Sequence, residues 1–193
     1  MILSRRQALA RMVALTGGVL VGAEFFLTRS VRADKRTTAS FTPDELALMD
    51  EIGETIIPAT DIPGAKAVGI SAFMASVATD CYDDATEALF RSGLGQINAA
   101  SRTRYGKSFL DAAPEERTAL LNELAKAERT HSAGNSDPPP PHYFHLFKQL
   151  TLLGYFTSEV GCTQALRYVA IPGAYHGDVP YRKGDKAWAN PLT

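Results

Sequence analysis

The stretch YFHLFKQLTLLGYF, residues 143–156, decides the fold. Its apolar residues fall on nearly every side of a helix, and they are Phe144, Leu146, Phe147, Leu150, Leu152, Leu153, Tyr155 and Phe156. A helix that is hydrophobic all round must be buried all round. In a small domain this requirement places residues 143–156 at the centre of the other helices, or against a second protein. The stretch therefore predicts a helical domain.

Four further helices are predicted upstream, because apolar residues recur there every three or four positions between start and stop signals. The first begins at Pro43 and is ended by Pro58, and the others cover Ser71–Cys81, Asp84–Tyr105 and Pro114–Thr130. Nowhere does an alternation of apolar and polar residues extend far enough for a strand. The predicted fold class is all-α: a small bundle of about five helices with an extended tail, rich in Pro and Gly, from about residue 169.

The first helix has the clearest start signal. Thr42 can cap it with Glu45 three residues later, Pro43 occupies the first helical position, and Phe41 can pack onto Leu46. The residues expected on the core faces of the four helices are Leu46, Met49, Ile52 and Ile56, then Phe73, Met74, Val77 and Cys81, then Leu89, Phe90, Leu94 and Ile97, and lastly Leu120, Leu121 and Leu124.

Two connections are predicted to be loops from their composition. One is PATDIPGAKAVG, residues 58–69, and the other is SAGNSDPPPPHY, residues 132–143. Four consecutive prolines cannot lie inside a helix and favour a stiff extended conformation. We expect a spacer loop there rather than a PxxP ligand.

The N-terminus resembles an export signal. Arg5 and Arg6, preceded by Ser and followed by Leu9, are similar to the twin-arginine consensus. The apolar run after them, residues 12–23, is shorter than the roughly 20 residues that span a bilayer. A cleavage after Ala33 would have small residues at the expected positions. We expect residues 1–33 to be a twin-arginine signal and residues 34–193 to be a single domain, located in the periplasm.

Two other interpretations of the leader stay open. Glu24 is unfavourable in a cleaved signal, so an uncleaved leader extending through Leu27 could anchor the chain to the inner membrane. The leader could also be an ordinary basic amphipathic helix.

Composition excludes one class of partner. Lys and Arg number 20 and Asp and Glu 21, so the net charge is −1. A surface that binds nucleic acid normally shows as a basic excess, so we expect no nucleic-acid partner. Cys81 and Cys162 could form a disulfide in an oxidising compartment, and two buried, unpaired side chains are the alternative. The chain contains neither C-x-x-C nor the haem-attachment motif C-x-x-C-H.

The sequence contains none of the common catalytic motifs. His142 and His145 are spaced i, i+3, but their neighbours offer no carboxylate or thiolate, so a solvated or capping pair is favoured over a metal site. Glu159 lies among apolar residues, and we expect it to be partly buried and paired with Arg167 or a backbone amide. We expect no catalytic, cofactor-binding or metal-binding residue in this chain.

Three blocks of the sequence resemble the family of gluconate 2-dehydrogenase subunit 3. They are the twin-arginine leader, LMDEIGETIIPATDIPGAKAVGISAFM at residues 48–74, and LTLLGYFTSEVGCTQALRYVAIPGAYHGDVPY at residues 150–181 followed by GDKAWA. The likeness covers nearly the whole chain after the leader, although residues 83–141 match mainly in pattern.

The resemblance implies a non-catalytic small subunit that accompanies a large FAD-dependent sugar or polyol dehydrogenase of the glucose–methanol–choline type, often with a c-type cytochrome. FAD and the catalytic base would lie in the large subunit, and haem c in the cytochrome. This chain would hold no cofactor. A leader read by the twin-arginine translocation machinery, which carries folded cargo, also fits the escort of a large subunit that lacks its own signal.

We infer that residues 150–181 bind the large subunit. A tail without regular structure loses much conformational entropy on ordering, and burial of its apolar side chains against a partner would offset that loss. The residues expected at this contact, including one tail tryptophan, are Tyr155, Phe156, Glu159, Tyr168, Ile171, Tyr175, Tyr181 and Trp188. The alternative is a tail that wraps its own bundle.

Two classes of function therefore compete. The first is a small subunit that assembles, stabilises and exports a flavin-dependent dehydrogenase. The second is a stand-alone exported enzyme or binding protein that uses Glu159, His142 and His145.

Overall fold

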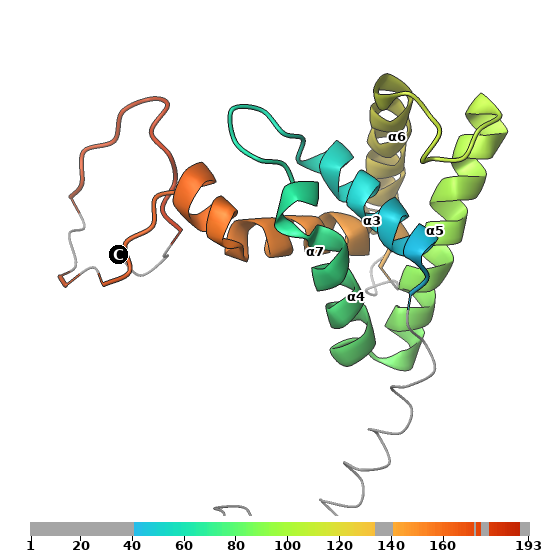
Figure 1. Cartoon of the computed structure of the whole chain (residues 1–193), viewed down its shortest axis with the longest axis horizontal. Coiled ribbons are helices and arrows are strands. Elements are labelled where there is room, and N and C mark those ends of the chain that lie inside the picture. The colour runs from blue at the N-terminus through green and yellow to red at the C-terminus, as the bar shows by residue number, and fades with distance from the viewer. Residues whose placement is uncertain (1–40, 134–140, 172, 175–177, 190–193) are drawn as a thin grey trace, which may run out of the picture. The chain divides into compact units, whose positions relative to one another are not determined.

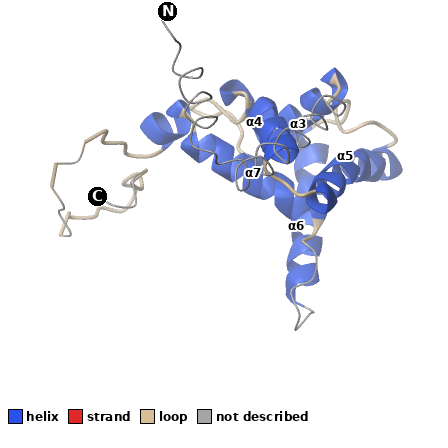
Figure 2. Ribbon diagram, turned by 90° about the horizontal axis from the view of Figure 1, so that it is seen from below, coloured by secondary structure: helices blue, strands red, loops and turns tan. Residues whose placement is uncertain are grey.

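We describe the chain from a computed structural model, which covers residues 41–133, 141–171, 173–174 and 178–189. The described residues form five α-helices and no strand beyond one isolated bridge, which confirms the predicted all-α class (Figures 1 and 2). The helices are α3 (Pro43–Ile56), α4 (Ile70–Asp80), α5 (Asp84–Tyr105), α6 (Pro114–Ala133) and α7 (Tyr143–Thr157), with a 3₁₀ turn η2 (Lys66–Val68) and a π-helical turn η3 (Gly161–Ala165).

The leader and the proline run at residues 134–140 lie outside the described residues. Among the helices that the structure describes, none combines the length and the hydrophobicity that crossing a lipid bilayer requires.

Local signals set the helix ends as the sequence predicts. In α3 the capping box is complete: the backbone N–H of Glu45 donates to Thr42 Oγ1 at 3.2 Å, and the backbone N–H of Thr42 donates to Glu45 Oε2 at 2.7 Å. Helix α5 ends at Gly106, whose φ of +70° is the left-handed conformation that glycine adopts most easily. Phe41 joins the core, where its ring packs edge-on against Phe90 at 6.0 Å, and Leu46 packs against the same cluster.

Helix α7 is the element around which the bundle is built. It contacts α3, α4, α5 and α6, and Figure 1 shows these four helices gathered along one part of it. The ring of Phe147 stacks on Phe90 of α5 at 4.4 Å, and both side chains are fully buried. The central position that the sequence predicts for this helix is therefore confirmed over most of its length.

Small residues let the helices approach α7 closely. A Cβ at Gly154 would lie 2.5 Å from Phe73 Cδ1 and 2.6 Å from Ile70 Cδ1, so α4 packs directly on the α7 backbone. Most predicted core residues are buried or partly buried, but Cys81 is exposed at the end of α4. The prediction that Cys81 lies on the core face of this helix is wrong, because α4 ends at Asp80 and the chain turns there into α5.

Candidate partner-binding surface

Exposed apolar side chains of the described residues gather in the C-terminal part of the chain. The large hydrophobic residues with substantial exposure are Leu152, Leu153, Phe156, Tyr168, Val169, Ile171, Val179, Tyr181 and Trp188. The described residues from 41 to 151, which form most of the bundle, add none to this group. We call these nine residues the C-terminal apolar surface. It is the main candidate for contact with another protein, since large exposed apolar patches are uncommon on monomers.

The last two turns of α7 supply the helical part of this surface. Leu152, Leu153 and Phe156 are 42%, 50% and 38% exposed, and their spacing places them on the same side of the helix. Of the two placements that the sequence leaves open for this helix, burial by the other helices does not extend to this side, and burial against a second protein stays a prediction. The other helices cover the opposite side of the C-terminal turns, where Gly154 lies against α4, and none of them reaches around to Leu153.

Tyr155 belongs to the fold and not to the exposed surface. Its side chain is only 4% exposed, and its hydroxyl donates a hydrogen bond to the carbonyl oxygen of Pro63 at 2.8 Å. Burial, with a smaller effect of the Glu54 charge, raises the pKa of this phenol. Tyr155 is therefore not exposed for the partner contact that the sequence predicts. Its hydrogen bond joins the loop after α3 to the end of α7.

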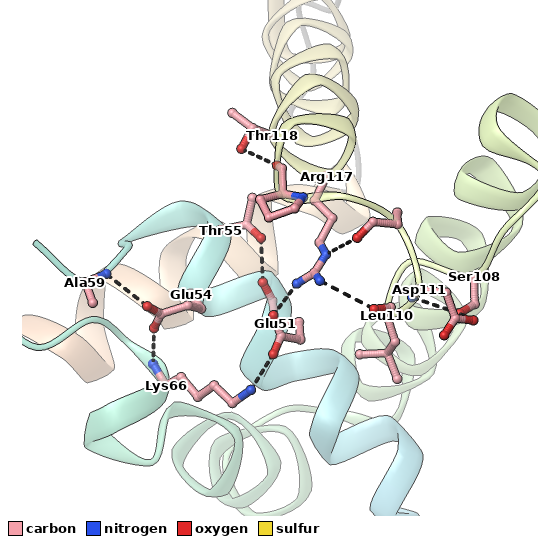
Figure 3. Close-up of polar contacts among 12 residues, drawn as sticks. Glu51, Glu54, Thr55, Ala59, Lys66, Ser108, Leu110, Asp111, Arg117 and Thr118 are labelled. Carbon is pink, nitrogen blue, oxygen red and sulfur yellow. Dashed lines mark hydrogen bonds and ion pairs between the residues drawn. The ribbon is translucent and has the colours of Figure 1, made fainter.

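The loop between α3 and η2 is held by two glutamates of α3 (Figure 3). The carboxylate of Glu54 accepts the backbone N–H of Ala59 through Oε1 and that of Lys66 through Oε2, both at 2.9 Å. A Cβ at Gly64 would lie 2.5 Å from both carboxylate oxygens, so only glycine fits there. The Glu54 carboxylate therefore holds both ends of the loop, while Thr60 and Asp61 at its tip are exposed.

Glu51 forms the second anchor of this region. Its carboxylate makes ion pairs with the ammonium of Lys66 and the guanidinium of Arg117, as Figure 3 shows. Arg117 also donates from Nε to the carbonyl oxygen of Ala112 at 2.9 Å. Burial alone would raise the pKa of Glu51, but the hydrogen bonds and charges of the two cations outweigh it and lower the pKa below its usual value. This network ties α3 to the loop and to α6.

A sharp break separates α7 from η3. The hydroxyl of Ser158 donates to the carbonyl oxygen of Tyr155 at 2.7 Å and accepts the backbone N–H of Gly161 at 3.1 Å. A Cβ at Gly161 would lie 1.9 Å from the carbonyl oxygen of Tyr155. Ser158 and Gly161 thus explain the motif GYFTSEVG as a tight turn at the end of a helix.

Glu159 is exposed at this break, so its predicted partial burial is wrong. The predicted pairing with Arg167 is also wrong, because the Arg167 guanidinium pairs with Asp185 Oδ2 at 3.0 Å. Glu159 lies in the break between α7 and η3, and its side chain is exposed to solvent there. It stays a candidate for the partner contact by position only.

The tail residues place their apolar side chains outward. Ile171 and Tyr181 are 85% and 77% exposed, and Tyr168 and Trp188 are also exposed. The alternative of a tail wrapped on its own bundle therefore does not hold for these side chains. Tyr175 lies outside the described residues.

The two cysteines are both free thiols in the structure, but neither is buried, so the second of the two alternatives that the sequence leaves open is met only in part. Cys81 is exposed after α4, and the Sγ of Cys162 in η3 lies 3.1 Å from the carbonyl oxygen of Phe156.

The two histidines lie at the start of α7. His142 caps the helix, since its Nδ1 accepts the backbone N–H of Phe144 at 3.2 Å, and burial with the nearby His131 lowers its pKa. His145 Nδ1 lies 2.8 Å from a carboxylate oxygen of Glu128 in α6. The capping role predicted for the pair is confirmed for His142. Within the described residues, no group of three or more His, Cys, Asp or Glu side chains is arranged to hold a metal ion.

His142 and His145 do not form one site with Glu159. The histidines lie in the first turn of α7, and Glu159 follows its end. At a rise of about 1.5 Å per residue, the helix separates His145 from Glu159 by on the order of 20 Å. The structure therefore does not bring together the residues of the stand-alone enzyme hypothesis.

The described residues thus form a helical bundle whose exposed large apolar side chains are concentrated in its C-terminal part. The chain belongs to the gluconate 2-dehydrogenase subunit 3 family, whose family model matches residues 43–173. This range begins with α3, includes the block at residues 48–74 and covers the second block up to residue 173, so the resemblance seen in the sequence is confirmed. No curated protein and no solved structure matched the chain.

Proposed function

We propose that this chain is the non-catalytic small subunit of an FAD-dependent dehydrogenase of the glucose–methanol–choline type that oxidises gluconate or another sugar. It binds the large catalytic subunit, stabilises it and escorts it through the twin-arginine pathway. The observation that carries the proposal is the C-terminal apolar surface. Its nine large apolar residues lie in the last two turns of α7 and in the tail, and two of them, Ile171 and Tyr181, are 85% and 77% exposed. Burial of such side chains against another protein is favourable.

In this proposal the work is divided between chains. The large subunit holds FAD and the catalytic base, and a c-type cytochrome with haem c receives the electrons. Membership in a family of dehydrogenase subunits supports a catalytic partner. The complex would work in the periplasm, attached to the inner membrane by an uncleaved leader or through its partners.

The escort role is tested by changing Arg5 and Arg6 to Lys. Twin-arginine recognition depends on the guanidinium groups and not only on charge, so export of this chain should stop. If the large subunit travels with it, the flavin-dependent dehydrogenase activity should remain in the cytoplasm. Arg11→Lys, which keeps the pair, is the matched control and should export normally. Normal periplasmic activity in the double variant would contradict the escort role.

The subunit role is tested by purifying this chain from its native host. We expect a flavoprotein with sugar dehydrogenase activity to accompany it. We also expect the chain prepared alone to lack flavin and haem absorbance and to show no turnover. Turnover by the isolated chain would favour the stand-alone enzyme, and recovery of the chain without a flavoprotein would refute the proposed complex.

A further inference from the structure

The backbone of Arg167, which follows η3, pairs with residues 187–189 near the end of the described chain. Its backbone N–H donates to the carbonyl oxygen of Ala187 at 2.8 Å, and its carbonyl oxygen accepts the N–H of Ala189 at 2.7 Å. These bonds form an isolated parallel bridge between Arg167 and Trp188. A parallel pairing of one residue is weak by itself, so side chains must hold it in place.

The Arg167 side chain supplies that support. Its guanidinium makes an ion pair with Asp185 Oδ2 at 3.0 Å and lies 5.1 Å from the centre of the Trp188 ring. Asp185 also accepts the backbone N–H of Arg182 at 2.9 Å, which fixes the turn that leads into the pairing. We call Arg167, Asp185 and Trp188 the clasp. A lone surface ion pair contributes little, but here one residue combines two backbone bonds, an ion pair and a cation–π contact.

The clasp does not serve the core of the bundle. None of its three residues belongs to the buried hydrophobic cluster of the described chain. The side chains next to it along the chain, such as Tyr168 and Tyr181, are exposed. The clasp therefore orders part of a surface that is itself in solvent. Such ordering costs conformational entropy, and it is useful where the ordered surface has to bind.

We propose that the clasp pre-forms the tail part of the C-terminal apolar surface, and that the large subunit of the proposed dehydrogenase recognises the clasped form through an apolar groove. This inference rests on the proposed function. The large apolar side chains exposed on the tail and at the end of α7, together with membership in a family of dehydrogenase subunits, favour an apolar groove of the large subunit as the occupant. Arg167 acts as a positioning residue: it closes the tail before binding, so that less entropy is lost on association.

The clasp can be observed without the partner, because Trp188 is the one tryptophan of the sequence. In Arg167→Ala the emission of Trp188 should shift to longer wavelength, and its quenching by acrylamide should rise. Far-ultraviolet circular dichroism and the melting temperature should not change, since the clasp lies outside the core. Arg167→Lys keeps the charge but not the planar fork and should be intermediate. Arg182→Ala removes the same charge from the same segment and leaves its backbone bond to Asp185, so it should behave as wild type.

Association is then measured with the flavin-containing large subunit that purifies with the wild-type chain. We expect the dissociation constant to rise about tenfold or more in Arg167→Ala and to stay unchanged in Arg182→Ala. The clasp proposal is overturned if Trp188 emission does not respond to Arg167→Ala, or if that variant binds as tightly as wild type. Equal weakening by both variants would assign the effect to charge and overturn it too.

The same series separates this inference from the proposed function. A wild-type chain that binds no flavoprotein refutes the function, and with it the docking role of the clasp. A wild-type chain that forms a stable dimer through the tail, detected by sedimentation and lost in Arg167→Ala, would assign the surface to a second copy of the chain and overturn the proposed partner.

Discussion

At the scale of single residues, two glutamates of α3 explain the pattern of residues in the block around residues 50–66. Glu54 satisfies two backbone N–H groups of the following loop, and Glu51 pairs with Lys66 and Arg117. Gly64 is required because a Cβ there would lie 2.6 Å from the backbone nitrogen of Ala59, beside the Glu54 carboxylate. The motif therefore encodes the shape of a loop and does not need a catalytic explanation.

Glu54→Gln should destabilise the chain by about 1–3 kcal/mol, because an amide can accept only one of the two backbone N–H groups and leaves the other without a partner. Urea denaturation measures the loss. Glu115→Gln, at an exposed position in α6, is the matched control and should stay within about 0.5 kcal/mol of wild type. Equal effects of the two changes would show that the loop does not depend on Glu54.

Glu51→Gln should remove a pH-dependent part of the stability. The pKa of Glu51 is lowered in the folded chain, so its ionised form stabilises the fold above the unfolded pKa of about 4.3. That contribution is lost as the pH falls through the folded pKa. The difference in unfolding free energy between wild type and variant should thus be largest near pH 6–7 and shrink toward about pH 3. A difference that is independent of pH would show that the Glu51 charge does not matter.

At the scale of the element, α7 has two different sides toward its C-terminal end. One side packs on α4 through Gly154 and on the loop after α3 through Tyr155. The other side presents Leu152, Leu153 and Phe156 to solvent. A single apolar helix therefore completes the core and supplies part of the candidate binding surface.

Gly154→Ala tests the packing side. The added methyl group would lie 2.5 Å from Phe73 Cδ1, and overpacking of this kind costs about 1–3 kcal/mol. Gly95→Ala in α5 is the matched control: its Cβ meets nothing within 4 Å, and alanine is the better helix former by about 0.5–1 kcal/mol. Thermal unfolding should show opposite shifts for the two variants. A stabilised Gly154→Ala would contradict the close contact of α4 with α7.

Phe156→Ala and Tyr155→Phe separate the two sides of α7. The exposed Phe156 should contribute to association, with a loss of roughly 1–3 kcal/mol on truncation and little change in stability. Tyr155→Phe removes the hydrogen bond to Pro63, so it should lower stability by about 0.5–1.5 kcal/mol and leave association unchanged. Binding to the large subunit and urea denaturation are measured for each. Loss of association only in Tyr155→Phe would reverse the assignment.

At the scale of the whole molecule, the described chain divides its apolar residues between two tasks. Residues 41–151 bury their large hydrophobic side chains in one cluster, and the C-terminal part leaves many of its own exposed. The bundle therefore has its own core, whereas the tail is ordered by the clasp and not by burial. This division is what we expect of a subunit that folds by itself and then binds.

Deletion of the chain after Val169 tests this division. The helices should remain folded, because the clasp and the tail side chains lie outside the core cluster, while the large subunit should no longer co-purify. Circular dichroism and co-purification are the two measurements, with Arg182→Ala as the full-length control. An unfolded truncation would show that the tail supports the core, and a folded truncation that still binds would place the interface on the bundle.

The sequence by itself determined the helices and most of their bounds, because caps, prolines, glycines and apolar spacing act within a few residues. It predicts a helix at 84–105, and α5 has the same bounds. Only the tertiary structure decided which sides of α7 are covered, since burial depends on where the other four helices end around it. It also decided that Arg167 pairs with Asp185 and not with Glu159, which is nearer to it in the sequence. That choice depends on the path of the backbone, which brings residue 188 next to residue 167 and leaves Glu159 in solvent.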